Sequence, residues 1–183
     1  MRKLTRSFYN QNTTLVAQQL LGKLLIHEVN GIRRIGRIVE TEAYVGPHDL
    51  AAHSSRGITS RTQIMYGSPG YAYVYLIYGI YHCFNVVTEP EGHGSAVLIR
   101  ALEPVLNIDQ RTQGPGLLCR AMGIDKQLNG HDLLGSTFYL AESEKESTFD
   151  IVSSKRIGVA YAKEWAESLL RFYIKDNPYV SKR

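Results

Sequence analysis

Two glutamates and a tyrosine alternate in the stretch "IVETEAY", residues 38–44, and His53 follows nine residues later. If the stretch is a β-strand, one face carries every second side chain: Ile38, Glu40, Glu42 and Tyr44. Two carboxylates that share a face are the usual catalytic pair of enzymes that cleave glycosidic bonds. Exposed glutamates are commonplace, however, and from the pair alone solvated charges or partners of nearby arginines are the favoured interpretation. The spacing does not say which glutamate would be catalytic.

Tyrosine is concentrated directly downstream of these residues. Seven of the twelve tyrosines fall between positions 44 and 81, and Tyr71, Tyr73 and Tyr75 alternate as one face of a strand. Strands favour tyrosine in any case, so a tyrosine-rich sheet core is one interpretation. The other is a platform for flat bases, because a base stacked on an aromatic ring contributes roughly 1–3 kcal/mol. A core built from phenols would have to satisfy many hydroxyl groups.

The segment 71–87 predicts a β-hairpin. Residues 71–77 and 81–87 have strand character, and Tyr78 and Gly79 lie at or near the bend between them. A tyrosine at such a bend could enter a base stack as a wedge.

Histidine and cysteine give no sign of a metal centre. The six histidines, at positions 27, 48, 53, 82, 93 and 131, have no standard zinc spacing, so we expect no metal. A lone histidine such as His53 is more often a hydrogen-bonded structural residue than a catalyst. Cys83 and Cys119 lie far apart without a CxxC motif, which predicts two buried thiols in a reducing compartment.

The composition is that of one folded domain. The chain has 183 residues, 44% of them hydrophobic and 21% charged, and its formal net charge is +4. A positive charge suits a polyanionic partner such as DNA, although it is weak support alone. No apolar run is long enough to span a membrane, and we expect no secretory signal.

The remaining elements follow from periodicity and turn residues. We expect helices at residues 13–25, capped by Thr13, and at residues 114–123, closed by Gly123. Strands are expected at 31–45 and 95–102, a solvated loop at 142–149, and either strand or turn at 156–166. Strands that cluster in sequence and are joined by short turns predict an α+β fold with a mostly antiparallel sheet.

Long motifs resemble one known family. The stretches "GRIVETEAYVGP", "AAHSSRG", "YVYLIYGIYHCFN", "VLIRALEP", "GPGLLCRAMGI" and "RIGVAYAKEWAESLLRFYIKDNPYVS" are similar to the 3-methyladenine DNA glycosylases of the mammalian alkyladenine (N-methylpurine) type. The resemblance runs in order along nearly the whole chain. It implies a single glycosylase domain over residues 1–183, α+β, with a curved, mostly antiparallel sheet and surrounding helices.

The resemblance also implies a reaction. Such enzymes flip alkylated or deaminated purines (3-methyladenine, 7-methylguanine, hypoxanthine, ethenoadenine) out of duplex DNA. Water then hydrolyses the N-glycosidic bond and leaves an abasic site for base excision repair. The family uses no lysine Schiff base, no metal and no cofactor.

Three catalytic roles carry over by motif. Glu42, the second glutamate of "ETEAY", matches the general base that activates the attacking water. Arg100 of "LIRALEP" matches the arginine that holds this water. Val159 of "RIGVAYA" matches the residue whose main-chain carbonyl completes the water's surroundings.

Four positions match the walls of the base pocket. Tyr44, His53 and Tyr75 would sandwich the flipped base, and the main chain at Ala51 and His53 would probe its edge. The resemblance gives His53 a packing and recognition role, and we assign no side chain as the proton donor for a neutral leaving base.

Three further positions match selectivity and DNA distortion. Asn85 of "CFN" matches an asparagine that clashes with the amine of normal guanine, and Leu98 would line the pocket floor. Tyr78 matches the wedge that fills the gap in the duplex, at the bend already expected from Gly79.

Two other functions remain open: an inert nucleic-acid-binding domain on the same fold, and a hydrolase of small glycosides or nucleosides. The joint presence of Glu42 and Arg100 favours an enzyme, and the wedge tyrosine favours DNA over a small substrate. We expect a monomer that acts on double-stranded DNA with damaged purines and not at a membrane. In a bacterium it would work in the cytoplasm at the nucleoid, and in a eukaryote in the nucleus.

Overall fold

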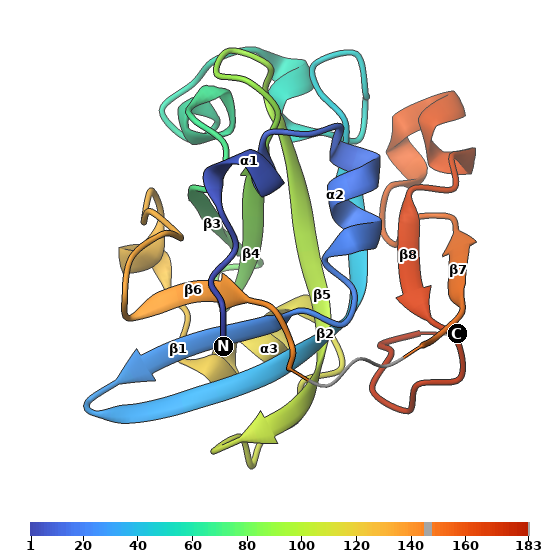
Figure 1. Cartoon of the computed structure of the whole chain (residues 1–183). Coiled ribbons are helices and arrows are strands. Elements are labelled where there is room, and N and C mark those ends of the chain that lie inside the picture. Colours follow the sequence, from blue (N-terminus) through green and yellow to red (C-terminus); the bar gives the residue numbers. More distant parts are fainter. Residues whose placement is uncertain (145–147, 183) are drawn as a thin grey trace.

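The computed structural model describes residues 1–144 and 148–182, and Figure 1 shows the arrangement of their helices and strands. In chain order the elements are α1 (Arg6–Tyr9), α2 (Thr13–Gln19), β1 (Leu24–Val29), β2 (Ile32–Tyr44), the 3₁₀ helices η1 (His53–Arg56) and η2 (Gln63–Tyr66), β3 (Ala72–Ile77), β4 (Tyr81–Thr88), β5 (Ser95–Leu106), α3 (Pro115–Met122), η3 (Lys126–Leu128), β6 (Phe138–Ala141), β7 (Ile151–Ser154), η4 (Ala160–Glu167) and β8 (Arg171–Ile174).

One antiparallel sheet organises the molecule. Its strand order is β3-β4-β5-β2-β1-β6, with β8 also paired to β2 and β7 paired to β8. The long strand β2 pairs along its length with β5, while its first half pairs with β1 and its second half with β8. The sheet therefore divides along β2 and curls around it, as the long curved strands of Figure 1 show. The expected α+β fold with a curved, antiparallel sheet is confirmed.

The two faces of the sheet carry different kinds of side chain. On one face, apolar side chains pack with α2 and α3 into the main core, and Thr41 donates a hydrogen bond to the carbonyl of Ala17 in α2 at 2.8 Å. On the other face lie the alternating polar and aromatic side chains of β2, β3, β4 and β5. The core face carries Val39, Ala43, Val74, Phe84, Val86, Val97, Ile99 and Ala101.

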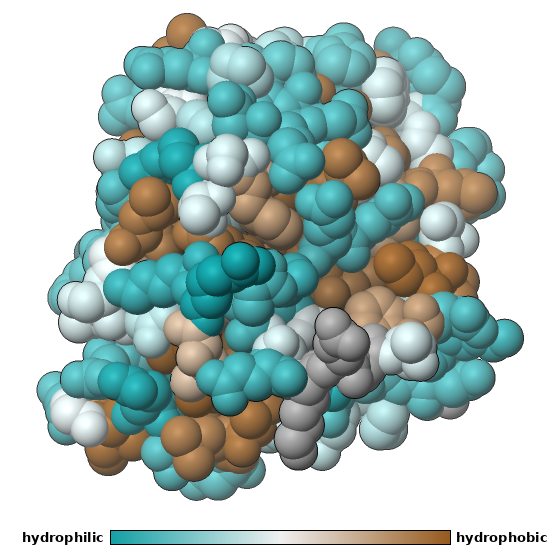
Figure 2. All heavy atoms as spheres, viewed as in Figure 1, coloured by the Kyte–Doolittle hydropathy of each residue, from teal (hydrophilic) through white to brown (hydrophobic). Residues whose placement is uncertain are grey.

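The short helices α1 and α2 lie over the near face of the sheet in Figure 1. Figure 2 shows that the outer surface of this side is mostly hydrophilic, with apolar groups scattered between the polar ones. No helix among the described residues is both long and apolar enough to cross a bilayer.

Two β-bulges surround Glu40 in the pairing of β2 with β5. Ile38 pairs with Leu102 and Glu40 with Ala101, which leaves Val39 unpaired. Because of this bulge, Ile38 and Val39 both lie in the main core. The expectation that Ile38 shares the face of the glutamates is therefore wrong.

The second bulge re-aims an arginine. Glu40 pairs with Ala101 and Thr41 with Ile99, so Arg100 has no direct partner across the strands. Its side chain lies on the face of the glutamates, which it contacts.

The first predicted helix is too long. It begins at Thr13 as expected but ends at Gln19, and Leu24 already belongs to β1. Gly22 has φ 82° and breaks the helix, and the leucines that follow are needed to pair with β2 and β6. The cap also differs, because the side chain of Asn12 accepts the N–H groups of residues 14 and 15.

Other expectations agree with the structure more closely. The hairpin of β3 and β4 turns at residues 78–80, and α3 ends before Gly123, which has φ 72°. Strand β5 runs four residues beyond the predicted 95–102. Residues 156–166 contain no strand and instead lead into the 3₁₀ helix η4. In the predicted loop 142–149, residues 142–144 and 148–149 form neither helix nor strand, and 145–147 lie outside the described residues.

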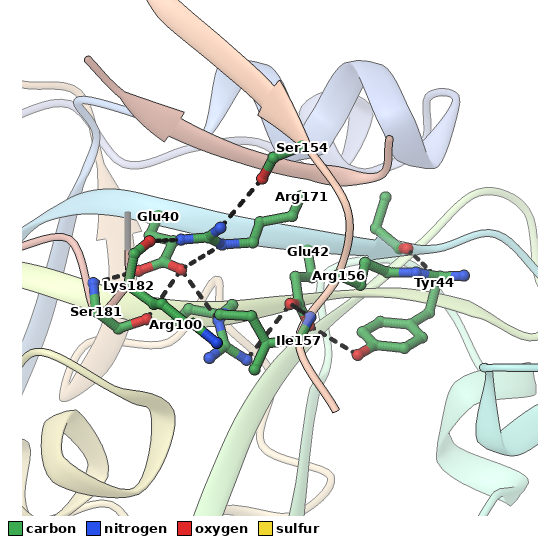
Figure 3. A network of polar contacts seen from close by, with 11 residues as sticks. Glu40, Glu42, Tyr44, Arg100, Ser154, Arg156, Ile157, Arg171, Ser181 and Lys182 are labelled. Carbon is green, nitrogen blue, oxygen red and sulfur yellow. Dashed lines mark hydrogen bonds and ion pairs between the residues drawn. The ribbon is translucent and has the colours of Figure 1, made fainter. Parts of the chain in front are cut away.

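Glu40 is a fully buried carboxylate with a complete set of partners. One oxygen accepts from Arg171 Nε at 2.7 Å, Arg100 Nε at 3.2 Å and Ser181 Oγ at 3.0 Å, and the other accepts the N–H of Ser181 at 2.7 Å. Arg171 also donates to the carbonyl of Lys182. Glu40 thereby joins β2, β5, β8 and residues 181–182, as Figure 3 shows.

Replacing Glu40 with glutamine should lower the free energy of unfolding by about 3–5 kcal/mol, because Arg171 would stay buried without a counter-charge. Urea denaturation at neutral pH measures the change. Glu167→Gln is the control: Glu167 pairs with Lys155 on the surface, their side chains are 70% and 57% exposed, and its loss should change stability by less than about 1 kcal/mol. Equal, small effects of both substitutions would contradict the structural role of Glu40.

Candidate active site

A cavity of about 380 Å³ opens on the polar face of the sheet, a size within the range of about 300–1,000 Å³ that is typical of small-molecule sites. Strands β3, β4 and β5 form its base, and the segments 51–61 and 157–161 form its sides. Its lining residues are Tyr44, Ala51, His53, Arg61, Met65, Tyr73, Tyr75, Ile77, Tyr78, Cys83, Asn85, Leu98, Arg100, Pro115, Ile157, Gly158, Val159 and Tyr161.

Strand register explains how residues distant in sequence meet here. Tyr73 pairs with Asn85, Asn85 with Leu98, and Leu98 with Glu42. These four residues therefore form one row across β3, β4, β5 and β2. Side chains of such a row point to the same face, which brings the second glutamate into line with the cavity floor.

Glu42 is buried completely and is held by three groups. Its Oε2 accepts the Tyr44 hydroxyl at 2.8 Å, and its Oε1 accepts the N–H of Ile157 at 2.7 Å. Arg100 Nη1 lies 3.5 Å from Oε1. All three partners line the cavity while Glu42 itself does not, so the carboxylate lies directly behind the wall that they form (Figure 3).

The two ionisable partners of Glu42, Tyr44 and Arg100, keep the protonation states in which they can interact with its carboxylate. Burial, reinforced by the Glu42 carboxylate, raises the pKa of Tyr44 well above its usual value, so the phenol stays a neutral donor. Burial acts to lower the pKa of Arg100, but the carboxylates of Glu42 and Glu40 outweigh it, and the net pKa is raised. Arg100 is therefore a permanent cation between two carboxylates.

The geometry separates the two glutamates that the spacing could not. Glu40 is held by Arg171 and Ser181, neither of which lines the cavity, and among its hydrogen-bond partners in the described residues only Arg100 does. Glu42 is bonded to three residues of the wall. The assignment of Glu42, Arg100 and Val159 to catalytic roles stays a prediction; the structure places Arg100 and Val159 in the cavity wall and Glu42 behind it, paired with Arg100.

Aromatic rings form one side of the cavity. The ring of His53 lies edge-on to Tyr75 with centroids 4.7 Å apart, and Tyr73 lies 5.3 Å from Tyr75. Tyr44 also lines the cavity, and its hydroxyl donates to Glu42 behind the wall. The three residues predicted as walls, Tyr44, His53 and Tyr75, thus share this cavity, and Tyr73 joins them.

His53 is a neutral imidazole at physiological pH. Its Nδ1 is 2.9 Å from the hydroxyl of Tyr73. Burial, and then the charges of Arg61 and Arg56, lower its pKa to about 4. Near neutral pH it is therefore not an imidazolium that could protonate a leaving base.

The predicted selectivity residues lie on the cavity floor. Asn85 is 4% exposed, and its amide nitrogen donates to the carbonyl of Tyr73 at 3.1 Å. Leu98 is its neighbour on β5. This hydrogen bond fixes the asparagine side chain in one orientation toward the cavity that it lines.

Tyr78 stands at the tip of the β3–β4 hairpin and is 86% exposed. It has φ 53° and the following Gly79 has φ 70°. A left-handed backbone is unfavourable for a bulky residue, whereas glycine adopts it freely. The tip, expected from Gly79 alone, therefore presents a strained and unburied aromatic ring at the edge of the cavity.

The main chain at Ala51 is already occupied by protein groups. Its N–H donates to Asp49 Oδ1 at 3.0 Å, and its carbonyl accepts the hydroxyl of Tyr161 at 3.2 Å. The carbonyl of Val159 accepts the N–H of Ala162 at 2.9 Å, and the Val159 side chain packs with Ala51. The two sides of the cavity are thus in direct contact with each other.

Several residues of the site were not found from the sequence. Ile157 contributes a backbone N–H, and nothing in its side chain signals that. The buried pair of Asp49 and Arg156 also adjoins the cavity. An acidic residue two positions after the "GP" of the glutamate strand was the available signal for Asp49. Within residues 1–144 and 148–182, no three His, Cys, Asp or Glu side chains are placed to hold a metal ion.

Comparison with known proteins agrees with the resemblance of the motifs. A curated protein of Legionella pneumophila (strain Paris), named "Putative 3-methyladenine DNA glycosylase", is 65% identical over 182 residues and covers 100% of both chains. Proteins with the same name from Desulfitobacterium hafniense (strain Y51) and Myxococcus xanthus (strain DK1622) are 49% and 48% identical. The first alignment covers 99% of each chain, and the second covers 100% of this chain and 95% of the relative.

The family pattern described as "Methylpurine-DNA glycosylase (MPG)" matches residues 7–178, which include every residue of the cavity wall. The chain belongs to the methylpurine-DNA glycosylase family.

Proposed function

We propose that this DNA glycosylase, a hydrolase of N-glycosyl bonds, flips alkylated or deaminated purines out of duplex DNA and releases them by attack of water, leaving an abasic site. The observation that carries the proposal is the placement of Glu42: a buried carboxylate behind the wall of an aromatic cavity, held by Arg100, a phenol and a backbone N–H. The substrates are 3-methyladenine, 7-methylguanine, hypoxanthine and ethenoadenine.

Flipping is required because a glycosidic bond inside the base stack is out of reach of a recessed carboxylate. The exposed ring of Tyr78 fills the space that the nucleotide leaves, and it recovers part of the lost stacking. The extruded base enters the cavity and lies against Tyr44, His53 and Tyr75.

The reacting water lies between Glu42, Arg100 and the carbonyl of Val159. As the bond between C1′ and the purine nitrogen breaks, positive charge develops on the sugar, and the fixed carboxylate stabilises it. The water oxygen bonds to C1′ and its proton passes to Glu42. A 3- or 7-alkylated purine is cationic before cleavage, so it accepts the bonding electron pair and leaves neutral.

A neutral lesion needs a proton from elsewhere. His53 does not supply it near neutral pH, because its pKa of about 4 leaves it unprotonated. Among the described residues no lysine lines the cavity, which supports hydrolysis by water without a Schiff base or strand cleavage. The enzyme acts as a monomer on DNA, and in a bacterium it works in the cytoplasm at the nucleoid.

Glu42→Gln should keep the shape of the site and slow base release by roughly 10²–10⁴-fold or more, because the water loses its base. The measurement is single-turnover release from duplexes that each contain one lesion, detected by hot-alkali cleavage at the abasic site. The variant should still bind the same duplexes, and Glu167→Gln should behave as the wild type. Release by Glu42→Gln at nearly the wild-type rate would refute the assignment, and release of bases from free nucleosides alone would refute the DNA substrate.

Tyr78→Ala should weaken binding to lesion-bearing duplex by about 5- to 150-fold, the equivalent of one lost stacking contact of roughly 1–3 kcal/mol. Fluorescence titration of a labelled duplex measures it. Ile151→Ala removes another exposed apolar side chain, 42% exposed on β7, and should leave the affinity unchanged. An unchanged affinity of Tyr78→Ala would mean that the tip only closes the hairpin.

Asn85→Ser should allow normal guanine into the cavity, because the amide that occupies the floor is shortened. Chromatography of undamaged DNA after long incubation should then detect free guanine above the wild-type background. Asn107→Ser is the control. The Asn107 amide donates to the carbonyl of Arg33 on the surface, and this variant should release no guanine. If Asn85→Ser also releases no guanine, the steric gate lies elsewhere.

A further inference from the structure

A buried ion pair lies directly beside the proposed catalytic carboxylate. Arg156 Nη1 donates to Asp49 Oδ2 at 2.6 Å and Nη2 to Oδ1 at 2.9 Å, a bidentate pair whose two side chains have no exposed surface. The two residues are 107 positions apart in the sequence. Bidentate geometry fixes both the distance and the relative orientation of the two groups.

Arg156 has further partners that surround the cavity. The same Nη1 donates to the carbonyl of Ala43 at 2.9 Å, and Nη2 donates to the carbonyl of Trp165 at 3.3 Å. The guanidinium also lies 4.8 Å from the ring centroid of Tyr44, whose hydroxyl binds Glu42. One side chain from the segment after β7 thus contacts β2, the loop that follows β2, η4 and a wall of the cavity.

Asp49 holds the opposite side. Its Oδ2 accepts the N–H of Val45 at 3.2 Å and its Oδ1 accepts the N–H of Ala51 at 3.0 Å. The pair therefore fastens the loop that leads to Ala51 and His53 onto the segment that begins at Arg156. These two segments form the two sides of the cavity.

The residue after Arg156 carries the critical hydrogen bond. The N–H of Ile157 donates to Glu42 Oε1 at 2.7 Å, and Val159 follows two residues later. A displacement of Arg156 would be transmitted through a single peptide unit to the donor that aims the carboxylate (Figure 3). We propose that Arg156, clamped by Asp49, is a positioning residue that aims Glu42 at the reacting water and sets the spacing of the cavity walls.

Stability alone does not explain this pair. A buried ion pair is seldom more stabilising than well-packed apolar residues of the same size, because desolvation offsets most of its Coulomb attraction. A catalytic group, in contrast, must be held within roughly 0.5 Å, and a shift of 1 Å can lower a rate by about 10²-fold. The planar guanidinium of arginine donates in a fixed geometry and so can hold a group this precisely, whereas lysine offers only a point charge.

The test compares Arg156→Lys and Asp49→Asn with the wild type, each kept well below its melting temperature. Two quantities are measured on a hypoxanthine-containing duplex: the single-turnover rate of base release and the dissociation constant. Each variant should release the base about 10- to 100-fold more slowly, while the dissociation constant changes by less than about 3-fold. The double variant should be no slower than the slower single variant, because both act through one clamp.

The control is Arg6→Lys. Arg6 forms an ion pair of 2.7 Å with Asp132, neither residue lines the cavity, and Arg6 also donates to the carbonyl of Pro69. This variant should release the base at the wild-type rate. If Arg156→Lys does not fold, Asp49→Asn, which keeps the shape of the side chain, carries the test.

The inference rests on the proposed role of Glu42, and the outcomes separate the two. A wild type that releases no base, or a Glu42→Gln variant that is fully active, refutes the proposed function. An active wild type with folded clamp variants of unchanged rate refutes the clamp alone. A fall in rate that matches the fall in affinity, or in the folded fraction, also refutes positioning, because the pair would then serve binding or stability.

Discussion

The buried charge of Glu42 is the constraint on which the rest of the site depends. A carboxylate without exposed surface has lost its hydration, and it is tolerated only where other groups replace the water. Arg100 from β5, the phenol of Tyr44 from β2 and the N–H of Ile157 from the segment after β7 do so. One carboxylate thus fixes the relative position of three chain segments. Because the same three groups line the cavity, the fold orients them before any substrate arrives, and the proposed reaction needs no reorganisation of these charges.

Two glutamates that are equivalent by strand alternation differ because of the bulges around them. The bulge at Val39 turns the chain before Glu40, and the bulge at Arg100 sets an unpaired arginine between the carboxylates. Glu40 then takes Arg171 and Ser181 as its own partners and holds Nε of Arg100. Nη1 of the same guanidinium is left to face Glu42. Glu40 orients the guanidinium of Arg100, and Arg100 forms an ion pair with Glu42. The stability of the sheet and the proposed chemistry are therefore coupled through one planar group.

The sequence predicted the features that depend on local pattern. Alternation placed Glu40, Glu42 and Tyr44 on one face, and Gly79 located the hairpin tip beside Tyr78. Features that depend on pairing between distant segments were missed. The leucines after Gln19 suit a helix as well as a strand, and only pairing with β2 and β6 decides between them. The bulges exist only in the register of two paired strands. The N–H of Ile157 is a main-chain group, and the partner of Asp49 lies 107 residues away, so no side-chain pattern could reveal either contact.

In the proposed function, the hairpin tip links extrusion of a base to its capture. Tyr78 is unfavourable for the isolated protein, because a left-handed backbone costs a bulky residue roughly 1–2 kcal/mol and an 86% exposed ring recovers nothing by burial. Asparagine or glycine would suit the turn better. The ring becomes useful only when something outside the chain covers it. The strands that carry this tip also carry Tyr73, Tyr75 and Asn85, which line the cavity. Because the two paired strands connect the tip to the cavity floor, the proposed wedge and the proposed pocket are parts of one hairpin.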